Sequence, residues 1–270
     1  HRDCDVILKA NDKDMKRAKE NGMSDALLDR LKLTSERVAA MADGIENVRK
    51  LPDCLGEIIN MEKRPNGLSI GQMRVPLGVV AIIYEARPNV TADAAALCIK
   101  TGNAVILKGG SDAIKSNTAI MNSLRAAVSE VLPKDVLTLI ESTDRESAAE
   151  LMKQNKYIDV LIPRGGAGLI RNVVENATVP VIETGTGNCH IYVHKNANID
   201  MAVNILINAK TQRIGVCNAA ESLVVDKDIA PIFLPAAQKA LDEKNVVIYG
   251  CEKTRKYIDA KEASEEDFGR

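Results

Sequence analysis

Along residues 79–182, short apolar runs alternate with longer segments in which apolar residues recur at helical spacing. The run at 79–84 is continuously apolar, which is typical of a strand buried on both faces of a sheet. Further runs of this kind occupy 104–107, 136–140, 158–162 and 179–182. The segments between them predict helices at 92–100, 114–131, 145–154 and 168–176. Because strands alternate with helices, the pattern predicts βαβ units, a parallel sheet and the α/β fold class.

The residues before this region have a different pattern. Residues 1–60 favour helices, and Asn11–Asp12 is predicted to cap a short charged helix that Gly22 ends. Thr34 is predicted to cap the next helix, whose apolar residues recur at helical spacing. Residues 68–75 alternate between apolar and polar residues, as in an exposed strand. We therefore expect a helical layer followed by a strand ahead of the main sheet.

After the polar segment Glu183–Asn188 the pattern changes again. It predicts a short strand at 191–193, a helix at 198–210 and a strand at 222–225. No charge run or low-complexity linker separates domains elsewhere, so Glu183–Asn188 is the predicted hinge. We expect two domains, at 1–184 and 185–270.

Composition narrows the classes of partner. The chain has 270 residues, enough for one large or two ordinary domains, with 46% hydrophobic and 27% charged residues as in a globular protein. Its net charge of -1 argues against recruitment to nucleic acid or membranes by bulk electrostatics. No Trp and only 2 Phe are available for stacking on bases, and no apolar run approaches the roughly 20 residues of a membrane span. We expect neither nucleic acid nor a membrane as a partner.

The cysteines do not form a disulfide or zinc pattern. There are 6 of them, none in a Cys-x-x-Cys pair: Cys4, Cys54, Cys98, Cys189, Cys217 and Cys251. His190 and His194 would share one face of a strand, but no third ligand accompanies them, so we expect no metal site. Unpaired cysteines fit a reducing, cytosol-like compartment, and an organellar stroma or matrix would fit equally.

Phosphate-binding motifs are incomplete. The chain has no P-loop, and the segment 185–190 fails as a dinucleotide fingerprint because His190 stands where the third glycine belongs. Arg164–Gly168 does lie between a predicted strand and a helix. Its glycines would let the backbone approach an anion at the helix N-terminus, although a tight turn without a ligand explains them equally well.

Three residues are candidates for contact with a ligand. Two of them, Lys108 and Asn89, lie at or beyond the carboxyl ends of predicted strands, where parallel sheets bind ligands. Lys108 ends a predicted strand and either faces a ligand or is simply solvated. Asn89 either donates to an oxyanion or makes a turn. Cys217 lies in a small uncharged turn between a helix and a strand, where it is either a nucleophile or a small buried hydrophobe.

Four stretches together resemble the gamma-glutamyl phosphate reductase family, a branch of the aldehyde dehydrogenase superfamily. They are 76–91 (PLGVVAIIYEARPNVT), 101–110 (TGNAVILKGG), 181–193 (VIETGTGNCHIYV) and 212–219 (QRIGVCNA). Their order and spacing cover nearly the whole chain. The resemblance implies an aldehyde dehydrogenase-like fold, with a Rossmann-type cofactor-binding domain at 1–184 and the start of a second α/β catalytic domain at 185–270.

The resemblance also implies a reaction on the route to proline. NADPH would reduce L-glutamate 5-phosphate to L-glutamate 5-semialdehyde and phosphate. Cys217 would be the nucleophile that forms a thioester, and Asn89 with the Cys217 N–H would form the oxyanion hole. Glu183 falls where aldehyde-oxidising relatives keep a general base, a role that a reductase does not need.

The same resemblance implies how the cofactor is held. Lys108 would contact the adenosine ribose, and Gly165 and Gly166 would form the turn beside the pyrophosphate. Ser111 replaces a carboxylate that NAD-preferring relatives place near the ribose hydroxyls, so we expect NADP. Arg87 and Arg213 would hold the substrate's phosphate or carboxylate, or serve as structural ion-pair partners.

Family members continue past the end of this chain, so the sequence is expected to be part of a longer protein. Three alternatives stay open: an aldehyde dehydrogenase of other specificity, an inactive nucleotide-binding or oligomer-forming piece, and the reductase half of a fusion with a glutamate kinase. We expect a cytoplasmic homo-oligomer, in which the strand at 68–75 pairs between subunits, and functional coupling to glutamate 5-kinase.

Overall fold

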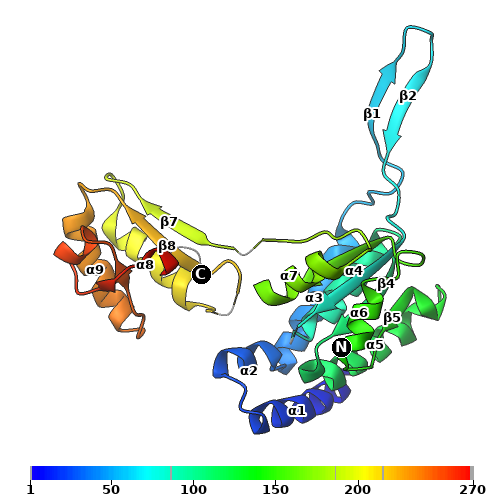
Figure 1. Cartoon of the computed structure of the whole chain (residues 1–270), viewed down its shortest axis with the longest axis horizontal. Coiled ribbons are helices and arrows are strands. Elements are labelled where there is room, and N and C mark those ends of the chain that lie inside the picture. The colour runs from blue at the N-terminus through cyan, green and yellow to red at the C-terminus, as the bar shows by residue number, and fades with distance from the viewer. Residues whose placement is uncertain (1, 86, 186, 215, 268–270) are drawn as a thin grey trace. The chain divides into compact units, whose positions relative to one another are not determined.

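A computed structural model describes the chain except for residues 1, 86, 186, 215 and 268–270 (Figure 1). Three residues of the motifs above, Ala86, Thr186 and Gly215, therefore lie outside the described residues. The chain divides into two units, residues 1–185 and residues 186–270.

A four-stranded parallel sheet forms the centre of the first unit. Its strands are β3 (Val79–Tyr84), β4 (Ala104–Gly109), β5 (Leu137–Leu139) and β6 (Val160–Arg164), in the order β5-β4-β3-β6. The central position of β3 explains its continuous apolar run, because helices cover both faces of the sheet. The predicted strand at 179–182 is reduced to a single parallel bridge between Leu161 and Val181.

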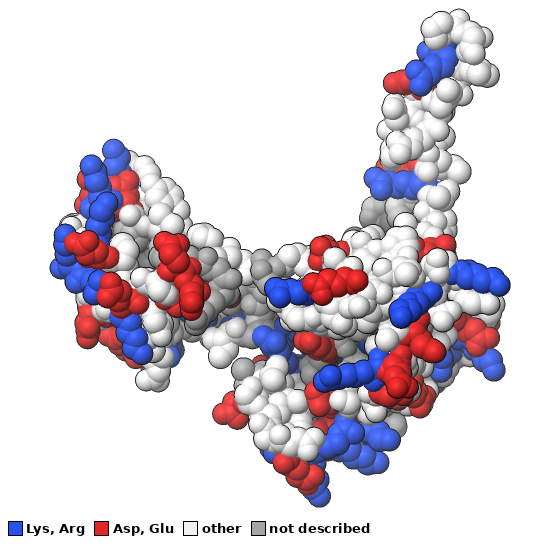
Figure 2. Space-filling view, in the orientation of Figure 1, with Lys and Arg blue, Asp and Glu red and all other residues white. Residues whose placement is uncertain are grey.

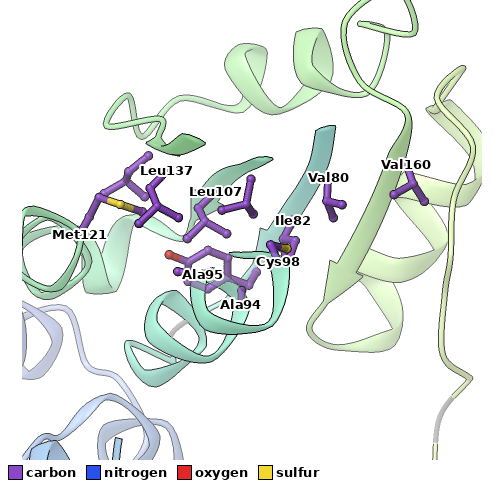
Figure 3. Close-up of a cluster of buried hydrophobic side chains, with 12 residues drawn as sticks. Val80, Ile82, Ala94, Ala95, Cys98, Leu107, Met121, Leu137 and Val160 are labelled. Atoms are coloured by element: carbon purple, nitrogen blue, oxygen red, sulfur yellow. The ribbon is translucent and has the colours of Figure 1, made fainter. Parts of the chain in front are cut away.

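Helices pack on both faces of this sheet. They are α4 (Asn89–Lys100), α5 (Ile114–Val128), α6 (Arg145–Leu151) and α7 (Ala167–Asn176), with the short 3-10 turns η1 (Ser111–Ala113) and η2 (Lys134–Val136). Alternate residues of β3 enter two separate cores: Ile82 packs with α4 and α5, whereas Ile83 packs with residues of α6 and α7. Figure 3 shows Cys98 of α4 beside Ile82 in the first of these cores. The helix predicted at 114–131 ends earlier, at Val128, and Val131 lies beyond it with 81% of its surface exposed.

The N-terminal layer contains α1 (Cys4–Glu20), α2 (Asp25–Leu31) and α3 (Ser35–Lys50). The predicted cap of α3 is confirmed, since the Thr34 side chain accepts a hydrogen bond from the Arg37 N–H. The predicted cap at Asn11 is wrong. Asn11 lies inside α1 and is buried, because its side chain bonds to the backbone of Leu31 and Leu33 instead of capping its own helix.

A two-stranded antiparallel hairpin follows α3. It consists of β1 (Ile58–Lys63) and β2 (Ser69–Met73), and every residue of both strands is exposed. The strand expected at 68–75 is therefore present, whereas the helical expectation for residues 1–60 is wrong from Ile58 onward. Figure 2 draws this hairpin mostly in white, which marks residues without formal charge.

The second unit has its own core. Strands β7 (Cys189–Val193) and β8 (Ala220–Val225) pair in parallel, and α8 (Ile199–Thr211) and α9 (Ala230–Asp242) pack around the fully buried Phe233. A second parallel pair, β9 (Tyr249–Gly250) and β10 (Lys261–Glu262), and the 3-10 turns η3 (Thr254–Lys256) and η4 (Glu265–Asp267) follow. The Asn198 side chain caps α8 by accepting from the Met201 N–H.

Candidate active site

The carboxyl edge of the sheet gathers the site residues predicted in the first unit. Lys108 is paired in register with Ile83, one residue before the end of β3, and Tyr84 is paired with Arg164 at the end of β6. Asn89 begins α4, which follows β3, and Gly165 follows β6 directly. Since parallel strands end at a common edge, these residues share the edge at which α/β sheets bind ligands.

Asn89 starts its helix three residues earlier than the sequence predicts. It is half-buried, and its Nδ2 donates to the Asp93 carboxylate over 3.0 Å. Burial raises the pKa of Asp93, while this hydrogen bond acts in the opposite direction. An amide nitrogen carries two N–H groups, so Asn89 retains one for a ligand.

A buried network of hydrogen bonds links β3, α4 and α5 at this edge. The Tyr84 hydroxyl and Thr91 Oγ1 lie 2.7 Å apart, and Thr91 Oγ1 lies 3.2 Å from Asn117 Oδ1. Burial raises the pKa of Tyr84 to about 12. Gly109 has no room for a side chain, because a Cβ there would lie 2.3 Å from Asn117 Nδ2. These residues were not predicted as part of the site, because their only signal in the sequence is a Thr and an Asn on otherwise apolar helix faces.

Lys108 is buried, with 5% of its surface exposed. Burial lowers the pKa of its ammonium group, and the negative charge of Asp144 partly offsets that effect. Asp144 caps α6 by accepting from the Ser147 N–H, and its pKa is lowered to about 2, chiefly by the hydrogen bond from Ser142. Lys108 is thus a buried side chain within the sheet edge and not a freely solvated strand end.

Ser111 lies two residues beyond β4, where it is exposed and begins η1. Its carbonyl accepts a hydrogen bond from Arg17 of α1. No local pattern in the sequence connects a residue of the N-terminal layer with this loop. The contact is long-range, since 94 positions separate the two residues.

The turn at Gly165 and Gly166 already holds a carboxylate. The Gly166 N–H donates to Glu85 Oε2 over 3.0 Å, at the N-terminus of α7. A Cβ on Gly165 would lie 2.7 Å from the Glu85 carboxyl carbon, so a larger residue there would displace the Glu85 side chain from this position. The turn therefore does bind an anionic group, and in this structure that group belongs to the protein.

Cys217 lies in the second unit, in the turn that joins α8 to β8, and its side chain is exposed. The Cys189 thiol donates to the Cys217 carbonyl over 3.4 Å, and a Cβ on Gly187 would lie 2.9 Å from the same oxygen. These contacts fix the peptide of Cys217 while leaving its thiol accessible. Cys251 is the other cysteine with an exposed side chain, and Cys98 is buried.

The remaining candidates are polar groups on the surface or in loops. Glu183 and Arg213 are exposed, and the Arg87 N–H donates to the Glu85 carbonyl. His190 Nδ1 lies 2.9 Å from the Asn188 carbonyl oxygen. Within the described part of the chain, no three His, Cys, Asp or Glu side chains are grouped so that they could hold a metal, and no helix is long and apolar enough to cross a membrane.

The sequence profile of the aldehyde dehydrogenase family matches residues 17–250. The chain belongs to the aldehyde dehydrogenase family. This confirms the predicted α/β fold with a parallel sheet. The fold also agrees with solved members of the family that share under a quarter of its residues, such as an acetylating aldehyde dehydrogenase from Geobacillus thermoglucosidasius (TM-score 0.64, 22% identity, 93% of this chain and 55% of that one).

Within this aldehyde dehydrogenase family, the chain is similar to gamma-glutamyl phosphate reductases, as its four motifs indicated. It is 60% identical to the one from Clostridium perfringens over 99% of its own length and 65% of that protein. It is 58% identical to the one from Carboxydothermus hydrogenoformans, with 97% and 64% covered. The crystal structure of the Thermotoga maritima protein of that name matches with a TM-score of 0.87 at 46% identity, covering 98% of this chain and 66% of that one.

This chain thus spans about two thirds of the length of those relatives, or 65% for the C. perfringens protein. The first unit supplies Asn89, Lys108, Ser111, Gly165 and Gly166, and the second supplies Cys217.

Proposed function

We propose that the protein is an NADPH-dependent reductase of L-glutamate 5-phosphate, forming L-glutamate 5-semialdehyde and phosphate on the route to proline. The observation that supports this most strongly is the 60% identity to a gamma-glutamyl phosphate reductase over 99% of this chain. That identity extends through both units. The first unit would be the cofactor-binding domain and the second the beginning of the catalytic domain.

Cys217 is the nucleophile in this proposal. Its thiolate attacks the carbonyl carbon of the acyl phosphate, the resulting tetrahedral oxyanion collapses, and phosphate leaves with the electron pair of the C–O bond. The product is a thioester on Cys217. The thiolate is the form that attacks, because it is a far stronger nucleophile than the thiol.

Asn89 and the backbone N–H of Cys217 donate to the oxyanion in the same proposal. The Asn89 amide has one N–H engaged by Asp93 and a second available. The engaged N–H holds the side chain in one orientation. An oxyanion donor of this kind typically contributes about 100-fold or more in rate.

The residues at the sheet edge fit a dinucleotide. Lys108 provides a buried amine, Ser111 an exposed position without a carboxylate, and the turn at Gly165 and Gly166 an anion-binding N–H that Glu85 occupies in this structure and would have to release. NADPH, when bound, supplies the hydride that converts the thioester to a thiohemiacetal. That intermediate then expels the Cys217 thiolate and releases the aldehyde, so Cys217 is regenerated.

We also propose the partners and the compartment. The hairpin of β1 and β2 exposes more apolar surface than a solvated element needs, including Ile58, Met61, Ile70 and Met73, each at least 50% exposed. A second copy of the chain would cover it, which makes the protein a homo-oligomer. A glutamate 5-kinase produces the acyl phosphate, so functional coupling to that enzyme and a cytoplasmic location complete the proposal.

The experiment that tests the function is the reverse reaction. Semialdehyde oxidation by NADP+ should require inorganic phosphate, because phosphate must attack the thioester to release the product. An aldehyde dehydrogenase of other specificity uses water instead and would turn over equally well without phosphate. Phosphate-independent oxidation would therefore contradict the proposed reductase, and no turnover at all would favour a nucleotide-binding piece.

A further inference from the structure

Arg17 of α1 reaches the loop that follows β4. Its Nη2 donates to the Ser111 carbonyl and, over 3.0 Å, to Asp14 Oδ1. Nη2 carries two N–H groups, and these two acceptors account for both. The guanidinium group is therefore fixed beside Ser111, the position at which we propose that the adenosine ribose binds.

Asp14 holds Arg17 from inside the protein. Its side chain is completely buried and accepts hydrogen bonds from Ser116 N, Ser116 Oγ and Lys115 N at the start of α5. One carboxylate thus joins α1, the first turn of α5 and the Arg17 guanidinium. Since α5 and the Ser111 loop are continuous in sequence, Arg17 cannot shift relative to Ser111 without breaking this buried network.

The rest of the guanidinium group faces outward. The Arg17 side chain is 40% exposed, and among the described residues no acceptor takes a hydrogen bond from Nε or Nη1. Nη1 keeps two N–H groups and Nε keeps one, and each of these can donate singly to a phosphate oxygen beside the positive charge. An arginine beside the ribose is a common way for a dinucleotide site to accept a 2′-phosphate.

We propose that Arg17 is the residue that recognises the 2′-phosphate of NADPH. The inference rests on the proposed cofactor site and deepens it: Ser111 removes a repulsive carboxylate, and Arg17 adds the attractive charge. Asp14 acts through Arg17 as a positioning residue.

The test is equilibrium binding of NADPH and NADH to the chain and to Arg17→Gln. We expect the variant to lose about 10-fold or more in affinity for NADPH, the size of one charge-assisted contact, and to bind NADH within about 2-fold of the wild type. Arg17→Lys keeps the charge and should retain most of the NADPH preference. Lys19→Gln makes the same charge change at an exposed position of α1 and should leave both affinities unchanged.

Adenosine 2′,5′-bisphosphate and AMP separate the 2′-phosphate from the rest of the cofactor. Only the bisphosphate should bind more weakly to Arg17→Gln. Thermal unfolding of Arg17→Gln shows whether the variant remains folded. Ser111→Glu, which places a carboxylate at this position, should also lower the affinity for NADPH.

Three results would overturn the inference in distinguishable ways. If Arg17→Gln keeps its preference for NADPH, or loses affinity for both nucleotides equally, Arg17 does not recognise the 2′-phosphate. If the wild-type chain binds both nucleotides alike, the NADP preference itself is wrong. If it binds neither, the proposed cofactor site and this inference fail together.

Discussion

At the scale of single residues, the surroundings of each thiol decide what it can do. Burial raises the pKa of Cys98 to about 11, which makes it inert at neutral pH. Cys251 has a lowered pKa because Thr254 hydrogen-bonds to its sulfur. From the sequence, Cys217 stands out as a candidate nucleophile among the six cysteines only by the turn around it and by the family motif. Exposure separates them further, and it depends on packing that a single sequence does not reveal.

Alkylation by iodoacetamide should follow these differences. In the folded protein, Cys217 and Cys251 should react and Cys98 should not, because the thiolate is the reactive form and Cys98 is both buried and un-ionised. Thr254→Val should raise the pKa of Cys251, so its reaction rate should begin to rise at a higher pH than in the wild type. Peptide mass mapping over a pH series measures both, and rapid labelling of Cys98 in the native state would contradict the packing described here.

Gly109 is required by its neighbours. Gly109→Ala would place a methyl group 2.3 Å from Asn117 Nδ2, and we expect it to destabilise the protein by about 1–3 kcal/mol through overpacking. Gly168→Ala is the matched control, because nothing lies within 4 Å of a Cβ there and the position is helical. It should be neutral or stabilising by up to about 1 kcal/mol. Urea unfolding compares them, and equal stability of the two variants would show that the buried chain from Tyr84 to Asn117 tolerates a side chain at 109.

At the scale of elements, prediction succeeded where local signals decide the structure. The apolar runs of β3 and β4 are buried on both faces, and Thr34 caps the helix that follows it. Prediction failed where pairing with another segment of the chain determines the structure. Strand β1 carries Asn60 and Glu62 among its apolar residues, so it forms only because β2 pairs with it. The short run at 179–182 has one neighbouring strand and remains a single bridge.

Asn11, in the middle of α1, shows the same limit in a testable form. Asn11 resembles a cap in the sequence, but its side chain bonds to Leu31 O, Leu33 N and Ser116 Oγ. Asn11→Ala should therefore destabilise the protein by about 1–3 kcal/mol, because it leaves buried partners unpaired. Asp12→Ala, at the exposed neighbouring position, should change stability by less than about 0.5 kcal/mol. Chemical denaturation checks both, and a larger loss for Asp12→Ala would restore the capping interpretation.

At the scale of the whole molecule, the sequence motifs carried the identification, whereas the structure supplied the surroundings of the site. The motifs contain Asn89, Lys108 and Cys217, and one of them ends at Gly110, directly before Ser111. They do not reveal that Glu85 occupies the Gly166 turn or that Arg17 and Asp14 hold the Ser111 loop. These contacts join segments roughly 80–100 positions apart in sequence, a range at which local patterns carry no information.

The central claim is that Cys217 carries the acyl group in a phosphate-dependent reductase. The most direct measurement is phosphate-dependent oxidation of L-glutamate 5-semialdehyde by Cys217→Ser, with Cys251→Ser as the control at the other exposed thiol. We predict that Cys217→Ser loses nearly all turnover while still binding NADPH, and that Cys251→Ser resembles the wild type. Unimpaired, phosphate-dependent turnover by Cys217→Ser would contradict the account.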